Sequence, residues 1–270
     1  MYTGGMEKQP ASPRWWDTLT AGLLLAALMT AATRLYATHW TQYLERVQYL
    51  TLLGGIAGLA LGYSRFTPKV IKWIALGYTL FAIPWQLGYT LSGQLEWSQR
   101  LSILAWRIST VANQLIQKKP FNDSIIFFTL MALLFWLIAL IAGYYLVRHG
   151  QPWTAIIPAG LGLIIIDHFD PHLESGPRYL LFFLFFGLMI VVRMTYLRNR
   201  AEWDSQGVMR APGAGGEISR AALGMVVVLM AFAWVAPASG AAFSPASELW
   251  VKLNKPWETV RTRFQDVFSS

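Results

Sequence analysis

Seven long apolar stretches dominate this sequence and constrain its fold more than any other feature. One helix crosses a bilayer core with roughly 20 apolar residues, whereas helices buried in soluble proteins are usually shorter. The stretches are 18–33 with a continuation to Trp40, 47–64, 73–95, 124–147, 150–166, 179–197 and 221–237. We therefore expect an all-α integral membrane protein with about seven transmembrane helices.

The composition and the residue pattern both favour helices in lipid. Hydrophobic residues make up 55% of the chain and charged residues only 13%, too few to cover a soluble domain of this size. The strands of a membrane barrel alternate apolar and polar residues, but the run Phe-Phe-Leu-Phe-Phe at 182–186 does not. The first stretch is longer than a signal-peptide core and lacks a clear cleavage site, so we expect it to be retained.

The charges of the short loops predict the orientation. Lys and Arg collect in short cytoplasmic loops. The segment from Arg65 to Lys72 is basic, whereas Asp167 to Glu174 contains three acids and no Lys or Arg. We expect a cytoplasmic segment 1–16, a membrane domain 17–237 and an extracytoplasmic tail 238–270, in the plasma membrane of a bacterium.

Two segments have the spacing of amphipathic surface helices. The connection 94–119 and the tail 238–270 each place apolar residues three or four positions apart, which forms one stripe along a helix. We expect the first either to lie on the membrane surface or to cover the outer end of the bundle, and the second either to lie on the surface or to face a partner. The stripes are Trp97, Leu101, Leu104, Ile108, Val111 and Leu115, and Trp250, Leu253, Trp257, Val260, Phe264 and Val267.

Charged residues within the apolar stretches are few. Arg34, Asp167 and Arg193 all fall near the ends of their stretches, where a long side chain can extend its charge to water. Transporters usually place paired charges near mid-membrane. A small-molecule transporter is therefore the third-ranked hypothesis.

No cofactor or metal is expected. Asp167, His168, Asp170, His172 and Glu174 resemble a metal site in residue type, but Pro171 breaks the helical alignment of the two histidines. Glycines 213–216 lack the strand and the Lys-Ser/Thr of a phosphate loop. The net charge of +8 fits membrane topology and anionic lipid better than nucleic acid.

Gly54, Gly58 and Gly62 form a stripe along one side of the second stretch. Small residues at this spacing let helix backbones approach closely in lipid. The contact serves either dimerisation or packing within one bundle, and we favour packing within the bundle.

Several short motifs carry a family resemblance. They are Asn122-Asp123, Gln151-Pro152-Trp153 with Pro158, Arg178-Tyr179-Leu180-Leu181, Arg200-Ala201-Glu202-Trp203, and Pro256-Trp257-Glu258 through Arg263-Phe264. Through these motifs, the segment from about residue 15 to residue 268 resembles the N-terminal membrane domain of bacterial transglutaminase-like proteins of the TgpA type.

The resemblance implies an extracytoplasmic transglutaminase-like domain that acts through a Cys-His-Asp triad. This chain has no Cys, so we expect it to be no enzyme itself. We expect a non-catalytic module that anchors or assembles such a domain or another partner at the outer face. The alternative is an accessory or scaffold subunit of a larger membrane complex.

Overall fold

The chain folds into a bundle of helices. The computed structural model describes Trp15 and residues 17–91, 96–116, 124–170, 176–206, 220–221 and 223–231. No strand occurs within these ranges, and residues 220–221 and 223–231 are helical. The long helices are α1 (Thr18–Tyr36), α2 (Glu45–Tyr63), α3 (Pro68–Gly88), α4 (Trp97–Ile116), α5 (Ser124–His149), α6 (Pro152–Phe169) and α7 (Gly176–Ser205).

Five of the described helices are long and apolar enough to cross a membrane: α1, α3, α5, α6 and α7. Helix α2 is as long as α1, but Glu45, Arg46 and Gln48 make its first turn polar. Of the expected stretch 221–237, only 221 and 223–231 are described. The protein is therefore an all-α, multi-pass membrane protein, and the count of seven spans stays a prediction.

Several helix boundaries differ from the expected ones, and two of the differences follow from the local sequence. Helix α3 begins at Pro68 rather than at residue 73, because Thr67 caps it in an extended conformation and proline suits the first turn. Helix α7 continues to Ser205, past the end of the apolar stretch at 197. Its last turns are polar and carry an Arg200–Asp204 pair at 4.0 Å, which suits a helix that leaves the lipid.

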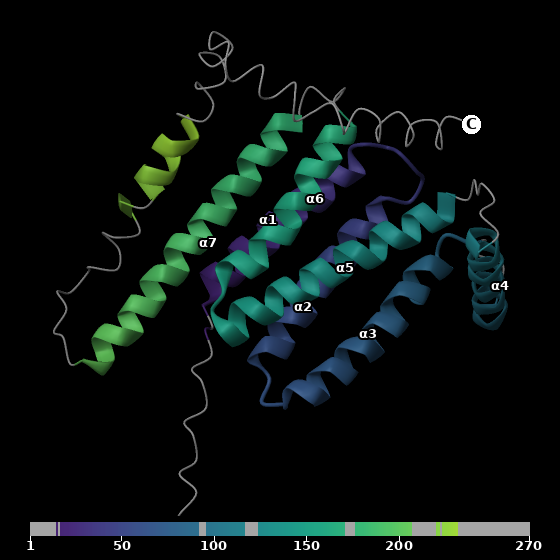
Figure 1. Ribbon diagram of the computed structural model, residues 1–270, viewed down its shortest axis with the longest axis horizontal. Coiled ribbons are helices and arrows are strands. Elements are labelled where there is room, and N and C mark those ends of the chain that lie inside the picture. Colours follow the sequence, from purple (N-terminus) through teal and green to yellow (C-terminus); the bar gives the residue numbers. More distant parts are fainter. Residues whose placement is uncertain are drawn as a thin grey trace, which may run out of the picture.

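Helices α1–α3 and α5–α7 lie side by side with alternating direction (Figure 1). The most extensive contact joins α2 and α5, and α1 packs against α2, α6 and α7. Helix α3 lies beside α2 and α5, and α4 contacts mainly α3. In Figure 1, α4 is seen almost along its axis while α3, α5 and α7 are seen from the side, so α4 crosses the bundle direction.

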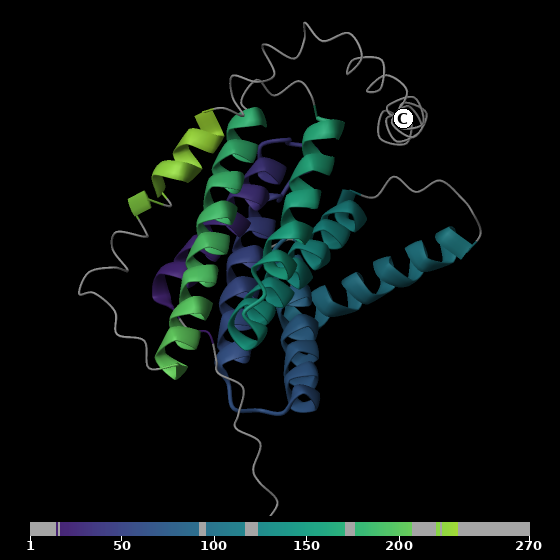
Figure 2. The ribbon, with the colours of Figure 1, turned by 60° about the vertical axis from the view of Figure 1, so that its left-hand side comes forward.

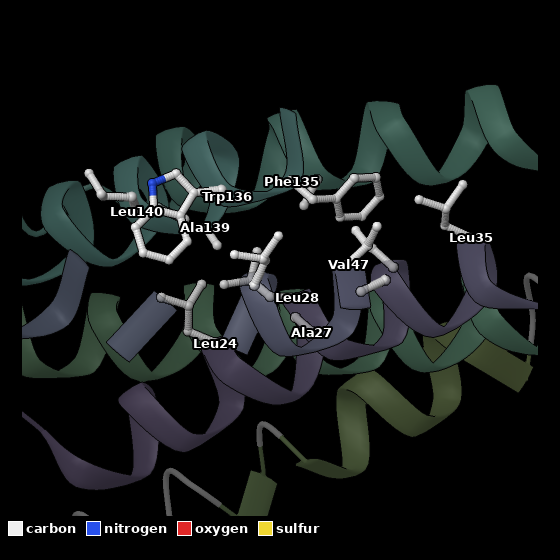
Figure 3. Packing of buried hydrophobic residues seen from close by; sticks show 14 of the residues in the cluster. Leu24, Ala27, Leu28, Leu35, Val47, Phe135, Trp136, Ala139 and Leu140 are labelled. Atoms are coloured by element: carbon white, nitrogen blue, oxygen red, sulfur yellow. The ribbon is translucent and has the colours of Figure 1, made fainter. Parts of the chain in front are cut away.

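The core lies where α1, α2 and α5 meet (Figure 3). Leu28 and Leu35 of α1, Val47 of α2 and Phe135 of α5 are at most 3% exposed. Between α3 and α5, the Trp136 indole N–H donates a 2.8 Å hydrogen bond to the Thr79 hydroxyl. Large apolar side chains outside this core are exposed, as lipid-facing surfaces require.

We name the two ends of the bundle by the residues that fix α1 there. At the Arg34 end, α1, α3 and α6 finish, and α2, α5 and α7 begin. At the Asp17 end, α1 begins and α2 connects to α3. There Arg148 at the end of α5 donates hydrogen bonds of 2.9 and 3.1 Å to the carbonyls of Ser64 and Phe66.

Candidate functional site: a buried arginine at one end of the bundle

The guanidinium of Arg34 is the most deeply buried charge in the described part of the chain. Arg34 lies in the last turn of α1, and its side chain is 0% exposed. Its Nε and Nη2 donate to Asp167 Oδ1 at 3.3 and 3.2 Å. Its Nη1 donates to Asp170 Oδ2 at 2.9 Å, and its Nη2 also donates to the Asp170 carbonyl at 2.8 Å.

The end of α6 supplies both carboxylates. Asp167 lies in the last turn of the helix, and Asp170 follows its last residue, with its N–H bonded to the Ile166 carbonyl. A cation is also favoured near the carbonyl-rich C-terminal ends of helices, and α1 and α6 both end here. The site therefore combines charge pairing, planar hydrogen bonding and two helix ends around one guanidinium.

This geometry overturns the expectation that Arg34 extends its charge to water. A buried guanidinium is tolerated only when it is paired and its donors are hydrogen-bonded, and Arg34 has both kinds of partner. Asp167 is 37% exposed and Asp170 18%, so the carboxylates rather than the arginine meet the solvent. Two carboxylates share one guanidinium, which leaves the cluster with an excess of negative charge.

A second ion pair fixes the other end of α1. Asp17 caps α1 by accepting hydrogen bonds from the N–H and hydroxyl of Thr20 at 3.1 and 2.6 Å. Arg193 of α7 binds the same carboxylate with Nε and Nη2, each at 3.1 Å. The expectation for Arg193 is corrected too, because its guanidinium meets a carboxylate rather than only water.

The Asp17 carboxylate titrates below its ordinary range. Burial acts to raise its pKa, but the hydrogen bonds from Arg193 and Thr20 and the charge of Arg193 outweigh burial, so the net pKa is lowered. Asp17 therefore stays ionised at neutral pH and keeps its pairing with α7. Helix α1 is thus held to α7 at its start and to α6 at its end.

The acidic and histidine residues around Asp167 do not form a metal site within the described residues. Asp167 and Asp170 are engaged by Arg34, and the His168 ring packs edge-on against Phe169 at 5.5 Å between centroids. No group of three His, Asp or Glu side chains in the described ranges could hold a metal ion. Pro171, His172 and Glu174 lie outside these ranges.

The structure places Gly54, Gly58 and Gly62 against α5 of the same chain. A Cβ added to Gly54 would lie 2.9 Å from the Trp136 carbonyl oxygen, and one added to Gly58 would collide with the backbone of Leu140. Gly62 faces Tyr144 and Val147. From the other side, a Cβ on Gly143 would lie 2.6 Å from the Leu59 nitrogen. The two backbones are therefore in direct contact, which only glycine permits.

The expected surface segment 94–119 contains α4. Leu104 is buried at 4% exposed, whereas Trp97 and Leu101 are 43% and 48% exposed. The apolar stripe of α4 is thus only partly covered by the bundle. The side chains of Ile108, Val111 and Leu115 are outside the described part, as is the whole tail with Trp250, Leu253, Trp257, Val260, Phe264 and Val267.

No family, curated protein or solved structure matches this chain in comparisons with known proteins. The Arg34 site is therefore assigned from geometry. A signal for it was present in the sequence, because the expected topology puts the end of the first stretch and the acidic loop 167–174 on one side of the membrane. An arginine and an acidic loop on one side are candidates for pairing.

Proposed function

We propose that this chain is a non-catalytic module of the plasma membrane that anchors or assembles a partner protein at the extracytoplasmic face. The short-loop charges assign the Arg34 end to that face and the Asp17 end to the cytoplasm. The proposal rests on one observation above others: ion pairs fasten α1 to α6 and α7 at its two ends. A helix held in this way presents the Arg34 end as a fixed surface.

The bundle offers surfaces for assembly. Helix α4 follows α3, which finishes at the Arg34 end, and projects from the side of the bundle (Figure 2). Its Ser98, Ser102 and Ser109 are exposed. A polar face on a projecting helix suits contact with a protein outside the membrane. By the resemblance to TgpA-type proteins, the partner is a transglutaminase-like domain.

An accessory subunit of a larger membrane complex is the second candidate. The exposed aromatic face of α3, with Trp73 at 73% and Phe81 at 67% exposed, favours it, because such a face suits either lipid or a neighbouring helix. A transporter is less well supported. The arginine–aspartate pairs that hold α1 lie at its two ends, whereas coupling sites are usually near mid-membrane.

Site-directed photocrosslinking in intact cells tests the proposal. A photoreactive amino acid at Ser102 or Ser109 is expected to capture a protein with an extracytoplasmic domain. The matched control is Arg65, an exposed position at the Asp17 end, which is expected not to capture it. Equal capture from both ends, or capture of cytoplasmic proteins at Ser102, would contradict the proposal. Mass spectrometry of the adduct distinguishes a transglutaminase-like domain from a subunit of a membrane complex.

A further inference from the structure

Helices α2, α3 and α4 meet in a corner built from arginine and aromatic side chains. The guanidinium carbon of Arg46 lies 5.2 Å from the centre of the Tyr89 ring. Tyr89 packs edge-on against Trp97 at 5.7 Å, and Arg100 lies 5.1 Å from the centre of the Trp97 ring. Arg46, Tyr89, Trp97 and Arg100 therefore form one continuous stack, which we call the arginine–aromatic corner.

The corner is built into the fold rather than being an incidental surface contact. The ring of Trp97 lies directly over Gly88, where any Cβ would collide with it. Arg100 is 8% exposed and donates a 3.3 Å hydrogen bond to the Gly88 carbonyl. These contacts hold the start of α4 on the end of α3 and fix Tyr89 and Trp97 in place.

Arg46 is the more exposed of the two arginines in the corner. Its Nε is shielded from solvent and has no hydrogen-bond partner among the described residues, while its side chain is 30% exposed. The Glu45 carboxylate is 3.8 Å away, too far for a hydrogen bond, and is itself 53% exposed. A partly exposed guanidinium favours an anionic acceptor that can bind two of its donors, as a phosphate does.

An apolar track along α3 leads to the corner. Trp73, Gly77, Phe81, Trp85 and the capping residue Tyr89 follow one another at four-residue spacing, so each lies beside the next in an oblique row that winds part of the way around the helix. Phe81 stacks on Trp85, Trp85 packs against Tyr89, and nothing lies within 4 Å of a Cβ built on Gly77. The row is an exposed aromatic surface with a notch, long enough to lie against an acyl chain.

We propose that the arginine–aromatic corner binds the phosphate headgroup of an anionic phospholipid, with the acyl chains lying along the α3 track. The ligand belongs to the leaflet at the Arg34 end, because α2 begins there and α3 ends there. Three observations agree on this occupant: Arg46 supplies a partly exposed positive charge, Tyr89 and Trp97 supply rings suited to the membrane interface, and the track supplies an apolar path. A soluble phosphate compound uses only the first of these features.

Native mass spectrometry of the full chain in detergent tests the proposal with phosphatidylglycerol and phosphatidylcholine as probes. The wild-type protein is expected to retain phosphatidylglycerol preferentially. Arg46→Gln is expected to weaken that retention about tenfold, the usual cost of a hydrogen bond to a charged group. Arg46→Lys keeps the positive charge and is expected to retain more phosphatidylglycerol than Arg46→Gln but less than wild type. Arg178→Gln, which removes an exposed arginine at the same end of the bundle, is the matched control and is expected to change nothing.

Three results would overturn the proposal. They are equal retention of the two lipids by wild type, unchanged retention in Arg46→Gln, and an equal loss in Arg178→Gln. Glycerol phosphate distinguishes the source of the phosphate: failure to displace the lipid supports a phospholipid, and displacement at equal concentration means a soluble anion site instead. The thermal unfolding of Arg46→Gln without added lipid verifies that the variant is folded.

Discussion

The Arg34 guanidinium of α1 and the Asp170 carboxylate at the end of α6 are joined by a 2.9 Å hydrogen bond across 136 positions of sequence. Together, Asp167 and Asp170 neutralise the charge of the fully buried Arg34 and accept its hydrogen bonds. The same helix α1 is tied to α7 through Asp17 and Arg193. The path of α1 through the bundle is therefore set by polar contacts at its ends and by apolar packing between them.

Loss of Arg34 should strongly destabilise the protein. Arg34→Met removes the charge, keeps a long apolar side chain and leaves two adjacent carboxylates without their partner. We expect a loss of about 3 kcal/mol in the free energy of unfolding, as when one partner of a buried pair is removed. Thermal unfolding in detergent measures it, with Arg178→Met at an exposed position of the same end as control. Equal melting temperatures for both variants would show that the buried pair contributes nothing.

The two aspartates should contribute unequally. The Asp170 side chain is 18% exposed and the Asp167 side chain 37%. Water therefore screens the Arg34–Asp167 ion pair more than the Arg34–Asp170 pair, and the Asp167 pair contributes less to stability. We expect Asp170→Asn to lower the melting temperature more than Asp167→Asn. The reverse order would mean that Asp167 is the main partner of Arg34.

Alanine at two glycines should act with opposite sign. Alanine at Gly58 would force its Cβ into the Leu140 backbone, and overpacking of this kind costs about 1–3 kcal/mol. Gly77 faces open space, so alanine there should stabilise the helix by about 0.5–1 kcal/mol. Thermal unfolding gives the sign, and the mass in detergent should stay the same for Gly58→Ala because the contact is internal. A stable Gly58→Ala variant would refute backbone contact between α2 and α5.

The Asp17–Arg193 pair should make the stability of the protein depend on pH in the acidic range. The folded pKa of Asp17 is lowered relative to its ordinary value of about 3.9. The pair therefore contributes fully to the free energy of unfolding at pH values above the ordinary pKa. This contribution is lost as pH falls through the lowered pKa of the folded state. Asp17→Asn keeps a capping residue for α1 but lacks the charge. We expect the stability difference between wild type and Asp17→Asn to be constant near neutral pH and to shrink in acid. A difference that does not change with pH would assign the effect to capping.

Reporter fusions test the orientation. Fusions after Lys69 and Arg200 should report a cytoplasmic location, and one after Glu174 an extracytoplasmic location, because basic short loops stay in the cytoplasm. An extracytoplasmic signal at Lys69 would invert the assignment of the Arg34 end. The assembly proposal would then have to be moved to the other face.

The sequence by itself determined the helical, membrane-embedded class of this protein. Apolar stretches of spanning length leave the backbone no partner but its own helix in lipid, and α1, α3, α5, α6 and α7 lie where those stretches are. The close-packing role of Gly54, Gly58 and Gly62 was also readable, because small residues at four-residue spacing have few other uses in lipid. The sequence did not show which helix these glycines contact, because any neighbouring helix would satisfy the same pattern.

Only the tertiary structure decided the partners of the charged residues. Arg34 and Arg193 were expected to reach water because each lies near the end of an apolar stretch, and a single helix cannot show what lies beside that end. In the folded chain, α6 brings Asp167 and Asp170 to Arg34, and the start of α1 brings Asp17 to Arg193. The physical reason is that the cost of burying a charge depends on groups distant in sequence, whereas apolar periodicity is a local property of each helix.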